Sequence, residues 1–214
     1  MSPRELSSSE RERANFWNNK WPKDRIIYNA QYGRPRDVRT FIFDRSYILE
    51  DVLRSYNIIH DGDDDEVMYK ITMSTIDRFR YVGDEKTKGQ REFWQNPEDS
   101  VTSGKGDCED GAILIKSLSL VAGVPDYKVR IAAGMVKGGG HAYVLYLRDD
   151  DTQCILDWCY WSNNLPIMSR KTWKQEENYY DIWFSFNKEF SFAAVSTSYG
   201  PGGNVNSELP KEKE

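Results

Sequence analysis

The segment from residue 104 to residue 125 constrains the fold more than any other part of the chain. Asp107 is a favourable N-cap, and Asp110, three residues later, can supply the carboxylate of a capping-box variant. Gly123, followed shortly by a proline, supplies the stop signal of a helix. The pattern therefore predicts a helix over residues 108–122. Its apolar stripe at helical spacing consists of Ala112, Ile115, Leu118 and Ala122.

The pattern changes from helical to extended after this helix. Residues 128–136, 141–148 and 153–158 alternate or run apolar as strands do. Three glycines at 138–140 and three aspartates at 149–151 suit hairpin turns. Two further segments with helical spacing lie upstream of residue 108, so the predicted helices come first and the predicted strands second. This order predicts an α+β fold. The two upstream helices are expected after Asp44 or Ser46 and over 67–81.

The chain length of 214 residues suggests one domain with extensions. We expect an N-terminal extension over 1–43 and the folded domain over 44–192. The remaining residues, 193–214, are rich in Gly, Ser, Pro and charge and are expected to form a flexible tail.

Charge and cysteine content exclude several classes of protein. Lys and Arg total 29 against 34 Asp and Glu, a net charge of -5, which argues against a nucleic-acid partner. The three cysteines form no CxxC pair, so a disulfide framework is not expected. The N-terminus lacks the apolar region of a secretory signal, and no apolar run approaches the roughly 20 residues of a membrane span. We expect a soluble, cytoplasmic protein without a membrane partner.

Cys108 lies at the predicted start of the best-capped helix. Free backbone N–H groups and the positive end of the helix dipole favour a thiolate there and can stabilise an oxyanion. Gly104 and Gly106 allow a substrate to approach the backbone closely. A free cysteine is most often a buried, inert residue. The charged residues around Cys108 argue instead for a nucleophile.

A base and its orienting partner can be found by strand geometry. Of the two histidines, His60 lies beside an acidic loop, whereas His141 opens a strand. If the flanking strands pair around Asp150, Tyr143 lies opposite Asp157, and His141 then shares a face with Asp157. Asp157 interrupts an apolar run and needs a partner. We therefore predict Cys108 as nucleophile, His141 as base and Asp157 as the residue that orients it.

Three motifs resemble the transglutaminase-like superfamily, and within it the bacterial cysteine-protease branch. They are GKGDCEDGA at 104–112, GHAYV at 140–144 and LDW at 156–158. WQNPE at 94–98 also looks like that branch, and the likeness covers about residues 65–160. The resemblance implies a papain-like α+β core with the nucleophile helix packed on an antiparallel sheet. It also implies an acyl-thioester mechanism.

The carboxylates beside Cys108 have two interpretations. They can cap the helix and interact with its dipole, or Asp107 and Glu109 can hold a calcium ion, as the resemblance implies for some members of the branch. The mechanism itself requires no cofactor. The second acidic run, residues 61–66, lacks the ligand order of an EF-hand and is interpreted as a solvated turn that caps the next helix.

The sequence favours a cysteine hydrolase or acyltransferase that acts on the amide bonds of a protein or peptide substrate. The Cys108 N–H would form the oxyanion hole together with the Gln95 or Trp94 side chain. The alternative is a non-catalytic structural or interaction protein, such as a virion-associated component of a bacteriophage. Such a protein would dock a protein partner through the aromatic-rich segment 158–192.

Overall fold

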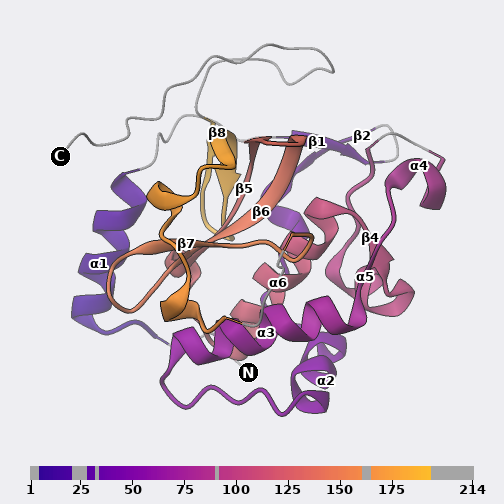
Figure 1. Ribbon diagram of the computed structural model, residues 1–214. Helices are drawn as coiled ribbons and strands as arrows, with labels where there is room; N and C mark the ends of the chain where they lie inside the picture. Colours follow the sequence, from indigo (N-terminus) through magenta and orange to yellow (C-terminus); the bar gives the residue numbers. More distant parts are fainter. Residues whose placement is uncertain (1–4, 21–27, 32–33, 90–91, 161–164, 194–214) are drawn as a thin grey trace.

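The structure is a computed structural model that describes residues 5–20, 28–31, 34–89, 92–160 and 165–193. Most helices lie on one side of an antiparallel sheet (Figure 1). The helices are α1 (Ser8–Asn19), α2 (Tyr47–Ser55), α3 (Asp64–Arg78), α4 (Asp84–Thr87), α5 (Pro97–Ser103) and α6 (Cys108–Ala122). The strands are β1 (Tyr28–Gln31), β2 (Arg34–Asp37), β3 (Arg80–Tyr81), β4 (Lys105–Gly106), β5 (Val129–Val136), β6 (Gly139–Leu147), β7 (Gln153–Leu156), β8 (Tyr179–Phe186) and β9 (Ser191–Ala193).

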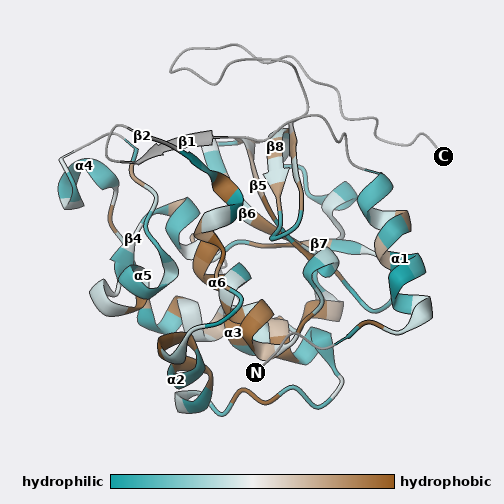
Figure 2. Ribbon diagram, turned by 180° about the vertical axis from the view of Figure 1, so that it is seen from behind, coloured by the Kyte–Doolittle hydropathy of each residue, from teal (hydrophilic) through white to brown (hydrophobic). Residues whose placement is uncertain are grey.

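Helix α6 is the centre of the core. It contacts β5 and β6 on one side and α2, α3 and α5 on the other, and it is largely hydrophobic (Figure 2). Its bounds are those the sequence predicts, with Asp107 as N-cap and Gly123 in the left-handed region at φ +101°. The predicted α+β class, with this helix packed on an antiparallel sheet, is confirmed.

The main sheet has the strand order β7-β6-β5-β8-β9, and all its pairings are antiparallel. Strand β6 pairs with β7 so that Val144 lies opposite Leu156, which is the register predicted from the hairpin around Asp150. The loop is closed by the N–H of Arg148, which donates to the Thr152 carbonyl at 2.8 Å. The predicted hairpin is therefore confirmed.

The acidic run before α3 is only partly the solvated turn that was expected. Asp63 caps the helix by accepting the Glu66 N–H at 2.9 Å, and α3 begins at Asp64, earlier than predicted. Asp64 is buried and accepts hydrogen bonds at 2.7 Å from Lys128 Nζ and His60 Nε2. The run therefore anchors α3 to the start of β5, because a buried carboxylate needs charged partners.

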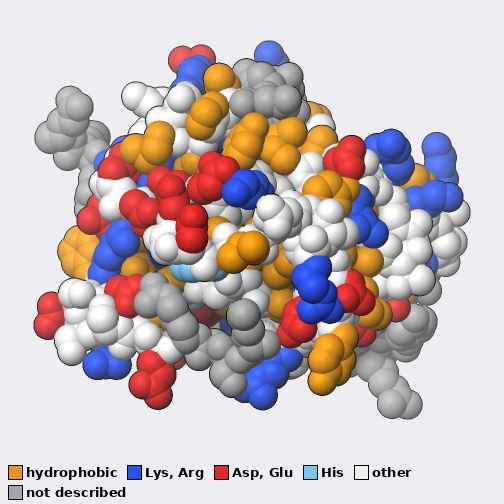
Figure 3. Space-filling model, turned by 90° about the horizontal axis from the view of Figure 1, so that it is seen from below, with side chains coloured by type: hydrophobic (Ala, Val, Ile, Leu, Met, Phe, Trp, Pro, Cys, Tyr) orange, Lys and Arg blue, Asp and Glu red, His pale blue; other side chains and the backbone are white. Residues whose placement is uncertain are grey.

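The aromatic-rich segment 158–192 completes the sheet. Strand β8 lies between β5 and β9, an interior position that the sequence did not reveal. Phe184, Phe186 and Phe192 are buried, so these aromatic side chains are part of the core packing. On the face seen in Figure 3, the described acidic and basic side chains are interspersed.

The predicted division of the chain remains a proposal. Helix α1 lies in the expected N-terminal extension, and its Arg13 Nε donates to Asp151 Oδ1 at 2.7 Å. Nearly all of the expected tail, from residue 194 onward, lies outside the described residues. None of the helices in the described part of the chain has both the length and the apolar character of a membrane span.

Gly111 provides a test of how α6 packs. A Cβ atom at this position would collide with the indole of Trp158. Alanine is favoured over glycine within a helix by up to about 1 kcal/mol. We nevertheless expect Gly111→Ala to lower the free energy of unfolding by about 1–3 kcal/mol, because overpacking forces a shift of Trp158.

The measurement is urea denaturation followed by circular dichroism. Gly83→Ala is the control for added volume, since a Cβ atom there meets nothing within 4 Å, and we expect a smaller loss that reflects only the N-cap of the short helix α4. A stabilised Gly111→Ala variant would contradict the packing described.

Candidate active site

Cys108 is held where three elements meet. It is the first residue of α6, and its sulfur lies beside the backbone N–H of Ala142 in β6. Its thiol donates to Glu109 Oε2 at 3.2 Å. Its carbonyl oxygen accepts the indole N–H of Trp158, just after β7, at 3.2 Å. The nucleophile candidate is thus fixed to the helix, the central hairpin and the chain that follows it.

His141 and Asp157 form a buried pair. The distance from His141 Nε2 to Asp157 Oδ2 is 2.7 Å. The His141 side chain is 5% exposed and the Asp157 side chain 4%. Asp157 also accepts the Tyr179 hydroxyl on Oδ2 at 2.7 Å and the Cys159 N–H on Oδ1 at 2.9 Å. Because Nε2 faces the carboxylate, the ring nitrogen left to take a thiol proton is Nδ1.

The structure pairs His141 with Asp157 and places Cys108 against the strand that carries His141. His141 is the chain neighbour of Ala142, whose N–H lies against the Cys108 sulfur. Tyr179, from β8, is an addition that sequence reasoning missed. The segment containing it has two adjacent tyrosines and no motif that distinguishes the inward one.

The electrostatics of the thiol differ from those expected of a helix N-terminus. Burial raises the pKa of Cys108 far above its ordinary value, and the Glu109 carboxylate raises it further. The Ala142 N–H acts in the opposite direction but is outweighed. These surroundings therefore favour the neutral thiol of Cys108 over the thiolate that was expected.

A cluster of carboxylates surrounds the first turn of α6. Oxygens of Asp84, Asp107 and Asp110 lie within 4.8 Å of one another. Burial, followed by the Asp107 charge, raises the pKa of Asp84 to about 6. Burial raises the pKa of Asp110 to about 7 and, together with Asp107, raises that of Glu109 well above its ordinary value.

The cluster has the oxygen atoms that a hard cation needs. Among the described residues, Asp84 Oδ1, Asp107 Oδ1 and Glu109 Oε1 are buried without a hydrogen-bond partner. Buried polar atoms are seldom left unpaired, and calcium takes six to eight oxygen ligands of this type. The residues therefore fit a calcium ion. Asp84 was not predicted, because nothing in its local sequence links it to α6.

Gln95 and Trp94 are both buried, and their side-chain donors bond other groups. Gln95 Nε2 donates to the Lys105 carbonyl at 3.0 Å and to Asp110 Oδ2, and its backbone N–H donates to Asp110 Oδ1 at 2.7 Å. The indole N–H of Trp94 donates to Glu92 Oε1 at 2.9 Å. The Gln95 contacts support the first turn of α6, and the predicted oxyanion role of Gln95 and Trp94 stays a prediction.

The family of the chain follows from comparison with known proteins. The family model for bacterial transglutaminase-like cysteine proteinases matches residues 54–188, more than half of the chain. The chain therefore belongs to this family and is a transglutaminase-like cysteine protease, as the motifs indicated. A comparison with curated proteins gives no match.

Solved structures of LapG from Legionella pneumophila share the fold. The EGTA-treated form is 21% identical, covers 68% of this chain and 74% of that one, and gives a TM-score of 0.54. The calcium-bound form is 19% identical, covers 73% of this chain and 81% of that one, and gives the same TM-score of 0.54. At this level of identity the likeness shows the fold.

The hydrogen bond from Tyr179 can be tested by one substitution. We expect Tyr179→Phe to lower the free energy of unfolding by about 1–3 kcal/mol, because the buried Asp157 carboxylate loses a donor. Chemical denaturation gives this value. Tyr180→Phe, at the exposed neighbouring position, is the control and should change stability by less than about 0.5 kcal/mol. Equal effects of the two substitutions would argue against the contact.

Proposed function

We propose that Cys108, His141 and Asp157 are the catalytic triad of this protease. The observation that carries the proposal is the buried hydrogen bond of 2.7 Å between His141 and Asp157, next to the strand residue that contacts the Cys108 sulfur. A buried ionisable pair usually lowers stability relative to apolar residues. Catalysis accounts for such a pair, whereas docking of a partner, the non-catalytic alternative, does not.

The chemistry follows from these positions. His141 Nδ1 accepts the thiol proton, and Cys108 Sγ attacks the carbonyl carbon of the scissile amide. The backbone N–H of Cys108 donates to the oxyanion. His141 then gives its proton to the leaving amine, which departs and leaves an acyl thioester. Water, activated by the same imidazole, releases the acid; an amine in its place would give acyl transfer. Asp157 keeps the imidazole oriented throughout.

Calcium belongs to the proposed function as a bound ion at the start of α6. Asp107 and Glu109 would hold it together with Asp84 and Asp110. The unpaired buried oxygens of Asp84, Asp107 and Glu109 support this assignment, as does the proximity of Asp110 to Asp84 and Asp107. One of the similar LapG structures is described as calcium-bound. When bound, the ion supplies positive charge beside Cys108. Helix capping alone would leave the buried carboxylates to share protons.

The triad predicts a specific set of losses. With a library of internally quenched peptides as substrate, we expect Cys108→Ala and His141→Ala to lower kcat/KM by at least about 10³-fold. Asp157→Asn should lower it by about 10²–10⁴-fold, because the imidazole loses its orienting carboxylate. Cys154→Ala is the control: Cys154 is buried in the sheet and should leave cleavage unchanged. Full activity of Cys108→Ala would refute the triad.

The calcium site predicts a ligand-dependent melting temperature. Millimolar calcium should raise Tm and a chelator should lower it, since a ligand at 100 times its Kd adds about 2.7 kcal/mol of stability. Asp107→Asn should abolish this response, whereas the exposed Asp61→Asn should retain it. Identical Tm values with calcium and with chelator would leave helix capping as the role of these carboxylates.

A further inference from the structure

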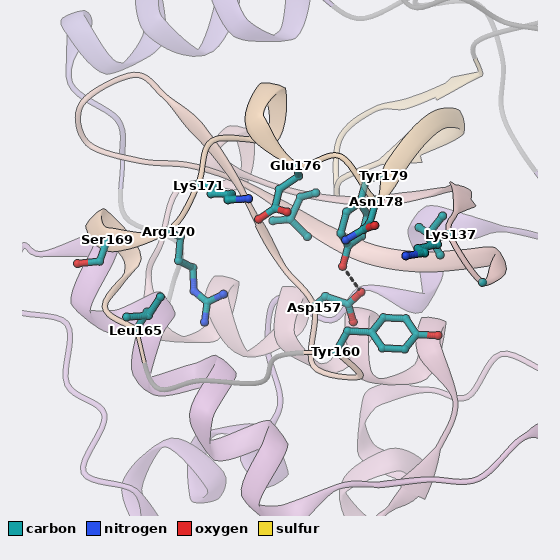
Figure 4. Close-up of a pocket in the computed structure, with 13 residues that line it drawn as sticks. Lys137, Asp157, Tyr160, Leu165, Ser169, Arg170, Lys171, Glu176, Asn178 and Tyr179 are labelled. Carbon is teal, nitrogen blue, oxygen red and sulfur yellow. Dashed lines mark hydrogen bonds between the residues drawn. The ribbon is translucent and has the colours of Figure 1, made fainter.

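A cavity of about 860 Å³ lies next to the proposed triad and has no role in the chemistry derived above. Four parts of the chain line it: the end of β5 with the turn after it, residues within 155–160, residues within 165–171, and residues within 176–179 (Figure 4). Its apolar lining includes Val136 and Ile155, which belong to a core cluster that contains no residue of α6. The cavity therefore lies on the face of the sheet away from α6.

The cavity adjoins the His141–Asp157 pair. Asp157 and Tyr160 both line it. The Tyr160 ring centroid is 4.9 Å from that of His141, and Asp157 accepts the imidazole N–H. A group bound in the cavity thus lies at the Asp157 end of the pair that Asp157 forms with the imidazole.

This position identifies which half of a substrate the cavity can receive. In amide cleavage by a thiol, the acyl half becomes bonded to the sulfur, and the imidazole protonates the nitrogen of the other half. The leaving half must therefore lie on the imidazole side. The chain that continues from the leaving nitrogen is directed toward the cavity.

The charge of the lining indicates what this chain carries. Lys137, Arg170 and Lys171 line the cavity, against the carboxylates of Glu176 and Asp157. Asp157 is already bound by His141, Tyr179 and the Cys159 N–H. Three cations against two carboxylates leave the lining net cationic, and guanidinium and ammonium groups pair with carboxylates.

We propose that this cavity binds the leaving side of the substrate and selects an acidic side chain there. The proposal rests on the proposed triad, because the triad defines the leaving side. The aliphatic floor accepts the stem of an Asp or Glu side chain, and the three cations receive its carboxylate. Such recognition makes the protease selective for acidic residues shortly after the scissile bond.

The experiment uses the full chain with calcium and an internally quenched peptide library, in which mass spectrometry identifies the cleaved bonds. For the wild type, we expect Asp and Glu to be enriched about threefold within the first few residues after the cleaved bond, in keeping with the modest energy of a solvent-accessible ion pair. Lys137→Glu and Lys171→Glu should each remove the enrichment. Lys174→Glu, an equal charge reversal at an exposed lysine outside the cavity lining, should retain it.

A second substrate separates the two proposals. A p-nitrophenyl ester of an acylated amino acid has no residue on its leaving side, so its hydrolysis reports the triad alone, and Lys174→Glu should hydrolyse it at the wild-type rate. A wild type that cleaves ester and library without acidic enrichment overturns the cavity proposal alone, as does equal enrichment in Lys171→Glu and Lys174→Glu. A wild type that cleaves neither substrate overturns the triad and the cavity proposal with it.

Discussion

A buried carboxylate holds the first turn of α6 in place. Asp110 is fully buried and accepts the backbone N–H groups of Gln95 at 2.7 Å and of Asp107 at 3.3 Å. These bonds tie the approach to the helix to the helix itself, which fixes the backbone that carries Cys108. They also place Asp110 beside Asp84 and Asp107. The geometry of the nucleophile therefore depends on a cluster of carboxylates that must either hold protons or bind a cation, because like charges this close repel one another.

The parts of the site that depend on local signals could be predicted from the sequence. The caps of α6 are short-range features, and the helix has the predicted bounds. The hairpin between β6 and β7 is also local, because a short turn determines the register, and the register determines which side chains share a face. That is why the contact between His141 and Asp157 could be predicted from the sequence.

The parts that depend on long-range contacts could not be predicted. Strand β8 pairs with β5, which lies far from it in the sequence, so no short turn determines the register of this pairing. The contact of Tyr179 with Asp157 depends on that register and could not be predicted. Asp84 reaches the acidic cluster from a separate short helix. The direction of the Cys108 pKa could not be decided from the sequence for a related reason. A helix terminus lowers the pKa and neighbouring carboxylates raise it, whereas burial, the first cause of the raised value, exists only in the folded chain.

The two sides of the proposed triad carry opposite charge. Asp107 and Glu109 adjoin the thiol, whereas Lys137, Arg170 and Lys171 line the cavity beyond the imidazole. An extended peptide crossing the site therefore meets a field that changes sign near the scissile bond. An acidic residue is attracted when it follows that bond and is repelled by the carboxylates when it precedes it. A cation bound by these carboxylates would weaken the repulsion. In the proposed binding mode, the position of an acidic residue therefore selects the direction in which a substrate chain binds. A chain bound in the reverse direction would place that residue beside the carboxylates near the thiol.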